Sequence, residues 1–306
     1  MKVFIDGSYG TTGIRISSRL EKRNDIELIK LSDENRKDVN ARKLALNSAD
    51  IVFLCLPDEA AKESVSLLEN EETVIIDTST AHRTNEGWIY GFPELSGNRE
   101  KIEKSKRIAN PGCHASGFVS LIAPLVENSV ISPDEKLTCF SVTGYSGGGK
   151  KMIADYENKE NIQSLCAPRM YGLTQSHKHL PEMVKVCGLD NAPLFSPIVS
   201  SFYSGMEVTV QLFGEQINGS VEDIKAVYRS YYNGKIIRFE ENEDENGFLS
   251  AGILSGKDGM QISVFGNSER ITLVSRFDNL GKGASGSAIQ NMNIVMGIDE
   301  TIGLNL

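Results

Sequence analysis

The sequence predicts two domains, an α/β domain with a parallel sheet and, after it, an α+β domain with a mixed sheet. A length of 306 residues suits two domains. Up to residue 113, short apolar runs alternate with amphipathic segments, as in βαβ units. Beyond residue 128, several runs alternate apolar with polar residues, which indicates a sheet with one covered face. We therefore predict domains at 1–113 and 114–284, and a C-terminal helical segment, 285–306, that packs back on the first domain.

The first element is a buried strand over Val3–Ile5, followed by a glycine-rich turn and an amphipathic helix. Glycines in such a turn let backbone N–H groups approach a pyrophosphate at the start of the next helix. The order strand, turn, helix is the one that the dinucleotide fingerprint requires, so we predict a Rossmann-type nucleotide-binding domain. The alternative is a tight turn without a ligand. The residues expected to contact the cofactor here are Gly7, Ser8, Gly10, Thr11, Thr12 and Gly13.

The second strand, 26–31, ends at Ser32, where an NAD-specific site would usually carry an acidic residue. Arg36 and Lys37 follow closely. A hydroxyl and two cations suit a 2′-phosphate, so this segment favours NADP. The alternative is a charged surface loop in which Asp33 binds the ribose of NAD.

Two more buried strands, 49–57 and 73–77, are separated by a helix over 59–68. Ligands of parallel sheets bind at the carboxyl ends of the strands. Leu56 and Pro57 are therefore expected at the cofactor, as is Ser79 in the loop after the second of these strands. Arg83, in the same loop, would offer a bidentate fork to a carboxylate or phosphate, or else form a surface ion pair. Cys55 is expected to be a core residue of its strand.

Cys113 follows the turn Asn110-Pro111-Gly112 and precedes an apolar run of helical spacing that stops near Asn128. A thiol at a helix N-terminus faces unpaired N–H groups and the positive end of the macrodipole, which lower its pKa. Cys113 is therefore a candidate nucleophile. The alternative is a small buried apolar residue.

The second domain is expected to contain a cluster of acid–base side chains. His177 and His179 flank Lys178, and Glu182 follows. Histidine titrates near neutrality and is the commonest acid–base partner. The alternatives are a solvated loop and a zinc site, for which no third and fourth ligand is evident. Expected strands cover 136–142, 194–199, 206–212, 261–265 and 270–276, with helices over 221–232 and from 287 to about 298.

The composition narrows the class of protein. A net charge of −9 argues against a general nucleic-acid binder, and the apolar stretches are too short to span a membrane. The five cysteines lack Cys-x-x-Cys spacing, which argues against a disulfide framework or a structural zinc site. We expect a cytoplasmic enzyme with a small-molecule substrate and no metal.

Taken together, the motifs resemble the N-acetyl-γ-glutamyl-phosphate reductase family, in its shorter type, among the aspartate-semialdehyde dehydrogenase-like proteins. The resemblance covers nearly the whole chain. Where the longer type has Pro-Gly-Cys-Tyr-Pro-Thr, this chain has Pro-Gly-Cys-His-Ala-Ser. The segments that carry the resemblance are 5–13, 77–83, 90–95, 110–113, 176–182, 278–283 and 290–293.

The resemblance implies NADPH-dependent reduction of N-acetyl-L-glutamyl 5-phosphate through a thioester on Cys113, in arginine biosynthesis. It places the catalytic histidine at His179 or His177, of which we favour His179. It implies a homo-oligomer, a dimer or a tetramer. Alternatives are a related enzyme acting on aspartyl or aminoadipyl phosphate, or a non-catalytic NADP-binding redox sensor. The family motifs add Asn291 to the predicted cofactor contacts, and the predicted substrate contacts are Arg83, Ser146, Lys178 and Glu182, with Lys150 and Lys151 as further cations.

Overall fold

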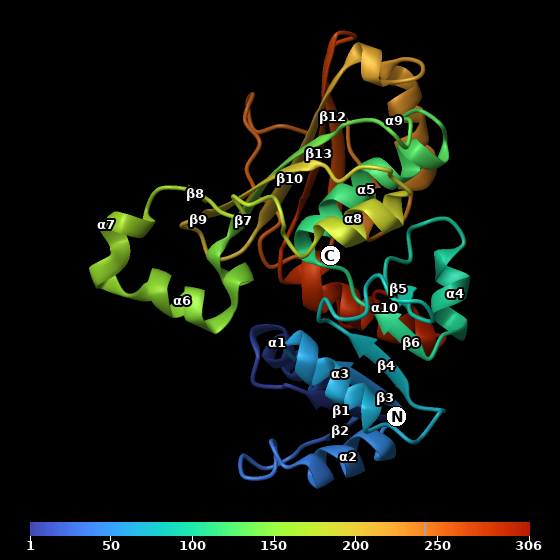
Figure 1. Cartoon of the computed structure of the whole chain (residues 1–306), viewed down its shortest axis with the longest axis vertical. Coiled ribbons are helices and arrows are strands. Elements are labelled where there is room, and N and C mark those ends of the chain that lie inside the picture. The colour runs from blue at the N-terminus through green and yellow to red at the C-terminus, as the bar shows by residue number, and fades with distance from the viewer. Residues whose placement is uncertain (242) are drawn as a thin grey trace. The chain divides into compact units, whose positions relative to one another are not determined.

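A computed structural model describes residues 1–241 and 243–306 (Figure 1). By packing, the chain forms two compact units. Unit 1 comprises residues 1–112 and 284–304, and unit 2 comprises residues 113–283 and 305–306. Within the described ranges, no helix combines the length and the apolar character needed to cross a membrane.

Unit 1 contains a six-stranded sheet in the order β2-β1-β3-β4-β6-β5, and every strand pair in it is parallel. The predicted α/β class with a parallel sheet is therefore confirmed. The strand β2 is shorter than the 26–31 expected; it lies at the edge of the sheet, and none of its residues is buried. The strands are β1 (Lys2–Asp6), β2 (Glu27–Ile29), β3 (Ile51–Leu54), β4 (Val74–Asp77), β5 (Ile89–Tyr90) and β6 (Arg107–Ala109).

Both faces of this sheet are covered, because successive residues of each strand point to opposite sides. On one face, Val3, Ile51 and Ile76 pack with side chains of α1, α4 and α10. On the other, Phe4 and Val52 pack with side chains of α2 and α3. This double cover explains why the strands read as continuous apolar runs. The helices are α1 (Thr11–Leu20), α2 (Val39–Ser48), α3 (Asp58–Ser66), α4 (Asn98–Lys104) and α10 (Gly286–Val295).

Unit 2 contains a mixed seven-stranded sheet in the order β11-β12-β13-β10-β7-β9-β8. The pairs β7–β9 and β11–β12 are parallel and the other pairs are antiparallel. The predicted mixed sheet is confirmed. The strands are β7 (Thr138–Gly144), β8 (Arg169–Met170), β9 (Leu194–Ser200), β10 (Met206–Phe213), β11 (Ile237–Phe239), β12 (Met260–Gly266) and β13 (Arg270–Phe277).

One face of this second sheet is covered by helix α5, which contacts β10, β13, α8 and α9 (Figure 1). The other face keeps large apolar side chains exposed, among them Phe140, Leu194 and Phe213. The helices of unit 2 are α5 (Cys113–Glu127), α6 (Gly149–Glu157), α7 (Ile162–Leu165), α8 (Leu180–Cys187) and α9 (Val221–Tyr231).

Helix α5 contains Pro124, which has no N–H to donate to the carbonyl of Ser120 one turn earlier. The hydroxyl of Tyr232, just after α9, donates to that buried carbonyl at 2.6 Å. A second hydroxyl, that of Tyr228, donates to the carbonyl of Leu121 at 2.6 Å. The helix therefore tolerates an internal proline because a neighbouring helix replaces the missing donor.

Sequence periodicity misses several helices. At α2 only three residues are buried, so the apolar stripe is too thin to show. Its start is nevertheless encoded, because the side chain of Asp38 accepts the N–H of Ala41 at 2.8 Å as an N-cap. Helix α8 begins at Leu180, inside the segment 175–183, for which the predicted acid–base cluster included no helix. Cys55, expected inside a strand, follows the end of β3 and is half-buried.

Candidate active site

The glycine turn of unit 1 has a backbone that a side chain would obstruct. Gly7 has a φ of +87°, and a Cβ there would lie 2.3 Å from the carbonyl oxygen of Cys55. A Cβ on Gly13 would lie 2.4 Å from the carbonyl oxygen of Gly7. Glycine is therefore required at both positions for the turn to pack against the end of β3 and against itself. Beside it, the buried Oγ1 of Thr11 has no hydrogen-bond partner among the described residues.

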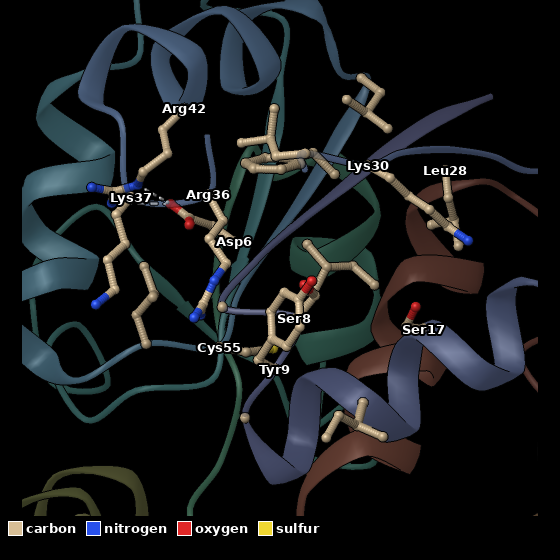
Figure 2. Close-up of a pocket in the computed structure, with 18 of the residues that line it drawn as sticks. Asp6, Ser8, Tyr9, Ser17, Leu28, Lys30, Arg36, Lys37, Arg42 and Cys55 are labelled. Carbon is tan, nitrogen blue, oxygen red and sulfur yellow. Dashed lines mark hydrogen bonds and ion pairs between the residues drawn. The ribbon is translucent and has the colours of Figure 1, made fainter. Parts of the chain in front are cut away.

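A cavity of about 820 Å³ opens at this turn (Figure 2). It is large enough for a substantial part of a dinucleotide. Of the predicted cofactor residues, the cavity brings together Gly7, Ser8, Gly10, Arg36, Lys37, Leu56 and Pro57. Its lining does not include the others, which are Thr11, Thr12, Gly13, Ser32, Ser79 and Asn291.

The charged side chains around the cavity differ in whether a buried partner neutralises them. Asp6, at the end of β1, pairs with the buried Arg42 at 3.1 Å and accepts the hydroxyl of Ser64 at 2.7 Å. Arg36 instead lies over the ring of Tyr9, at 4.6 Å from its centroid (Figure 2). Its exposed guanidinium also forms an ion pair with the exposed Asp33 at 3.8 Å. Asp6 is thus neutralised inside the fold, whereas the positive charges of Arg36 and Lys37 remain at the surface, where an anion can reach them.

The loop after β4 is tied down by buried polar contacts. Asp77 accepts the N–H and the hydroxyl of Ser79 at 2.9 and 2.8 Å, and lies 2.6 Å from Nδ1 of His82. Arg83 donates to the backbone carbonyls of Asn110 at 2.9 Å and Thr78 at 3.1 Å. The guanidinium of Arg83 thus braces the turn that precedes Cys113, which neither alternative from the sequence anticipated.

Asn110 connects that turn to helix α10 within unit 1. Its N–H donates to the carbonyl of Asp77 at 2.7 Å, and its Nδ2 donates to the carbonyl of Ala284 at 3.1 Å. Nδ2 of Asn291 donates to Oδ1 of Asn110 at 3.2 Å and to the carbonyl of Gly91 at 2.9 Å. Oδ1 of Asn291 is buried and accepts no hydrogen bond from the described residues. An amide oxygen is therefore left for a bound group to satisfy.

Cys113 is the first residue of α5, so its side chain lies where backbone N–H groups are not used by the helix. It is the one residue between Ile108 and Leu125, a stretch described throughout, that is not fully buried. Among the other cysteines, desolvation raises the pKa of Cys55 to about 12 and raises the pKa of Cys139 and Cys187. Cys166 is exposed. Cys55, Cys113 and Cys166 are thus at least partly exposed, and the raised pKa of Cys55 keeps that thiol protonated and unreactive.

Three histidine rings of unit 2 lie within 6 Å of one another. The ring of His114 is 5.7 Å from that of His177 and 5.6 Å from that of His179, and the latter two are 4.7 Å apart. Nδ1 of His114 lies 2.7 Å from Oγ of Ser141, and its Nε2 lies 2.6 Å from the hydroxyl of Tyr171. Burial, with a smaller contribution from His177, lowers the pKa of His114 to about 3.

His177 and His179 differ in the surroundings of their ring nitrogens. Nδ1 of His177 accepts the backbone N–H of His179 at 3.2 Å, so in this arrangement the neutral ring carries its hydrogen on Nε2. His179 is buried, and its Nε2 lies 4.0 Å from Oε1 of the buried Glu182. A carboxylate there favours the protonated form of His179. His179 is thus better placed to gain and lose a proton.

The remaining predicted substrate residues lie in varied surroundings. Ser146 is buried and accepts Nδ2 of Asn279 at 3.1 Å, whereas Lys178, Lys150 and Lys151 are exposed. Over residues 1–241 and 243–306, no three His, Cys, Asp or Glu side chains form a group that could hold a metal ion.

Sequence analysis does not identify Ser141 or Tyr171. Ser141 has one available signal, which is a polar residue at a buried position of the alternating strand β7. Tyr171 follows the two-residue strand β8, and no local pattern distinguishes it from the other tyrosines. Both residues contact His114 but lie far from it in the sequence, so the sequence gives no sign that they are its neighbours.

Comparison with known proteins places both units in one family. Residues 2–105 match the model "Semialdehyde dehydrogenase, NAD binding domain", and residues 113–279 match "Semialdehyde dehydrogenase, dimerisation domain". The chain is 42% identical, over 99% of each chain, to N-acetyl-gamma-glutamyl-phosphate reductase 2 of Nostoc sp.. It is 44% identical to N-acetyl-gamma-glutamyl-phosphate reductase of Brucella ovis, over 97% of this chain and 99% of the relative.

Solved structures share the fold at low sequence identity. Aspartate semialdehyde dehydrogenase from Francisella tularensis superposes with a TM-score of 0.73 at 14% identity, covering 97% of this chain and 100% of that one. The enzyme from Candida albicans, solved with NADP, superposes with a TM-score of 0.67 at 15% identity, covering 98% of this chain and 99% of that one. The predicted Rossmann-type domain, with a second domain built on a mixed sheet, is the arrangement of these proteins.

Proposed function

The chain belongs to the N-acetyl-γ-glutamyl-phosphate reductase family of semialdehyde dehydrogenases, and we propose that it performs the corresponding reaction in arginine biosynthesis. The reaction is reduction of N-acetyl-L-glutamyl 5-phosphate to N-acetyl-L-glutamate 5-semialdehyde and phosphate, with NADPH as reductant. The observation that carries the proposal is the accessible Cys113 at a helix N-terminus, in one unit with the histidine cluster. A cytoplasmic, reducing setting suits such a thiol.

Cys113 divides the reaction into two steps. Its thiolate attacks the acyl carbon, the carbon–sulfur bond forms, and the bond to phosphate breaks with departure of inorganic phosphate. The first turn of α5 supports this step, since its unused N–H groups stabilise both the thiolate and the oxyanion that forms on the acyl oxygen. The product of this step is a thioester on Cys113.

A histidine then moves the proton that the second step requires. The imidazolium of His179 gives a proton to the oxygen of the tetrahedral intermediate on Cys113, and His179 takes that proton back as the carbon–sulfur bond breaks and the aldehyde leaves. The assignment is supported by Glu182 at 4.0 Å, which stabilises the imidazolium. His177 is the second candidate, because its ring lies 4.7 Å from that of His179.

The residues of unit 1 fit a nicotinamide dinucleotide. Gly7, Ser8 and Gly10 line the cavity, and a glycine turn directly before the N-terminus of α1 suits a pyrophosphate. NADP is favoured over NAD because the exposed Arg36 and Lys37 line the same cavity. The buried, unsatisfied oxygens of Thr11 and Asn291 are further polar groups available to the cofactor. When bound, such a cofactor supplies the hydride.

Cations and polar side chains are assigned to the substrate. Lys178 is exposed beside the two histidines and would attract the anionic phosphate or carboxylate. Ser146 and Glu182 are candidate contacts to the uncharged groups of the substrate, including its N-acetyl amide. Arg83 is also assigned to the substrate, although its hydrogen bonds to the carbonyls of Asn110 and Thr78 favour a role in bracing the turn before Cys113.

We also propose that two copies of the chain associate through unit 2. This unit matches a family model described as a dimerisation domain, and one face of its sheet exposes Phe140, Leu194 and Phe213. Apolar side chains of this size on an open sheet are favourable to bury against a second copy.

The activity can be tested in the reverse direction with purified protein, N-acetylglutamate semialdehyde, phosphate and NADP. We expect phosphate-dependent formation of NADPH. Cys113→Ser should lower turnover by roughly 10³-fold or more, because a hydroxyl is a far weaker nucleophile than a thiolate. Cys166→Ser is the matched control and should retain turnover.

Aspartate semialdehyde serves as the competing substrate. Turnover of that aldehyde without turnover of N-acetylglutamate semialdehyde would assign the chain to the sister reaction. Full activity of Cys113→Ser would remove the thioester mechanism.

A further inference from the structure

His114 lies directly after Cys113, and the reaction above gives it no role. Its ring is 3% exposed and is hydrogen-bonded at both nitrogens, to Ser141 and to Tyr171. Because the pKa of His114 is lowered to about 3, the ring is neutral at physiological pH. A neutral imidazole donates at one nitrogen and accepts at the other. The three side chains therefore form a hydrogen-bonded chain that has a direction.

The direction follows from Ser141. Its hydroxyl is fully buried, and within the described part of the chain its hydrogen-bond partner is His114 alone. If Nδ1 of His114 carried the hydrogen, the O–H of Ser141 would be left without an acceptor, at a cost of about 1–3 kcal/mol. The satisfied arrangement is the opposite one. The O–H of Ser141 donates to Nδ1, and Nε2–H of His114 donates to the oxygen of Tyr171.

The hydroxyl hydrogen of Tyr171 is then available to donate to another atom. The ring of Tyr171 lies 6.1 Å from that of His114 and 5.9 Å from that of His177. Burial, and secondarily the charge of Cys113, raise the pKa of Tyr171, so the phenol keeps its hydrogen. Tyr171 is thus a protonated donor within electrostatic range of the Cys113 sulfur.

We propose that the hydroxyl of Tyr171 donates to the oxygen of the acyl group that reacts at Cys113, and that His114 is the positioning residue that orients it. The inference rests on the proposed thioester chemistry. As sulfur adds to the carbonyl carbon, the π electron pair moves onto the oxygen and the hydrogen bond from Tyr171 strengthens. When the leaving group departs, the pair returns and the bond weakens. No proton is transferred, and the donor stabilises the tetrahedral state over the ground state.

Two thiol reagents distinguish donation by Tyr171 to the acyl oxygen from an effect of Tyr171 on the reactivity of the Cys113 sulfur. Acylation of Cys113 by p-nitrophenyl acetate passes through an oxyanion, whereas alkylation by iodoacetamide displaces iodide and forms none. Both are measured on protein that carries Cys166→Ser, so that the exposed second thiol does not react. For Tyr171→Phe we expect acylation to fall about 10²-fold, as for loss of one oxyanion donor, while alkylation changes by no more than about twofold. An equal fall in both rates would show that Tyr171 acts on the thiolate, and would overturn the proposal.

A double-mutant cycle tests the role of His114. His114→Phe removes both ring nitrogens and should lower acylation about 10-fold, because the Tyr171 hydroxyl loses its fixed orientation. Added to Tyr171→Phe, it should have no further effect. Effects that multiply would mean that His114 does not act through Tyr171. His114→Gln keeps an N–H donor and should stay within about threefold of the starting rate.

The nitrogen-15 NMR spectrum of His114 provides a readout that needs no variant. We expect hydrogen on Nε2 and an unprotonated Nδ1, and the opposite tautomer would overturn the proposal even if His114→Phe does not fold. Since neither reagent is an acyl phosphate, the outcome is also separable from the proposed function. A chain inactive on N-acetylglutamate semialdehyde that shows the expected rates overturns only the reductase assignment. An active reductase whose Tyr171→Phe variant keeps full acylation overturns only this inference.

Discussion

Among single residues, His177 and His179 differ in the groups that lie beside their ring nitrogens. Nδ1 of His177 is occupied by the backbone N–H of His179, and protonation of that nitrogen would break the bond. His179 instead has the buried Glu182 close to Nε2, so gain of a proton adds an attraction between opposite charges. The geometry therefore favours His179 where the residue types alone do not choose between the two.

Replacement of each histidine by asparagine tests this preference. His179→Asn should lower kcat by about 10²–10⁴-fold, the usual contribution of a general acid–base group. His177→Asn should lower it by less than about 10-fold, since asparagine can still accept the N–H of His179. The measurement is steady-state kinetics of the reductase reaction, with circular dichroism to check folding. The reverse order of effects would make His177 the catalytic group.

We propose that Arg36 selects NADPH over NADH. Its guanidinium is exposed at the cavity and stacks on Tyr9, so it is oriented but not neutralised deep in the fold. Arg36→Ala should raise KM for NADPH by roughly 10–100-fold, the range for a lost hydrogen bond to a charged group, with little change for NADH. Lys22→Ala removes the same charge from an exposed site outside the cavity lining and serves as the control. Equal effects on the two cofactors would remove the 2′-phosphate assignment.

At the scale of secondary structure, α5 shows how a buried functional helix keeps its geometry. It presents Cys113 at its first residue and carries Pro124 in its interior. The carbonyl that this proline leaves without an N–H accepts the hydroxyl of Tyr232 from the end of α9. The position of Cys113, the proposed nucleophile, thus depends on a donor more than 100 residues away in the sequence.

Tyr232→Phe should therefore destabilise unit 2. Loss of the hydroxyl leaves the buried carbonyl of Ser120 unsatisfied, and we expect the free energy of unfolding to fall by about 1–3 kcal/mol in urea titrations. Tyr231→Phe is the matched control, since that hydroxyl contacts Glu127 at the surface and its loss should cost less than about 0.5 kcal/mol. Equal losses for the two variants would mean that the carbonyl is satisfied in another way.

For the whole molecule, the open face of the second sheet is the feature that a single copy leaves unexplained. Phe140 is 43% exposed, Leu194 65% and Phe213 61%. Such a surface in water favours association, and the sheet belongs to the segment that matches the dimerisation model.

Phe140→Lys should shift the chain from dimer to monomer, because burying an unpaired ammonium in the interface is strongly unfavourable. The measurement is molar mass by size exclusion with light scattering, at several protein concentrations. Leu44→Lys, at a 70% exposed apolar position on α2, is the control and should leave the mass unchanged. An unchanged mass for Phe140→Lys would move the interface elsewhere.

The sequence by itself determined the elements whose chemistry is local. The turn needs glycine at Gly7 because φ there is +87°, and at Gly13 because the carbonyl of Gly7, close by in the sequence, leaves no room for a Cβ. The thiol of Cys113 gains its environment from the helix that begins at the same residue. The alternation of apolar runs and helices predicted the parallel sheet, since its strands β1, β3 and β4 are buried on both faces.

Tertiary structure alone decided how the polar groups are paired. His114 meets Ser141 and Tyr171, which are 27 and 57 residues away, and the tautomer of His114 follows from those contacts. Tyr232 completes α5 only after α9 has packed beside it. Hydrogen-bond partners of buried groups depend on which distant atoms folding brings within 3 Å, and no periodicity in the sequence encodes that distance.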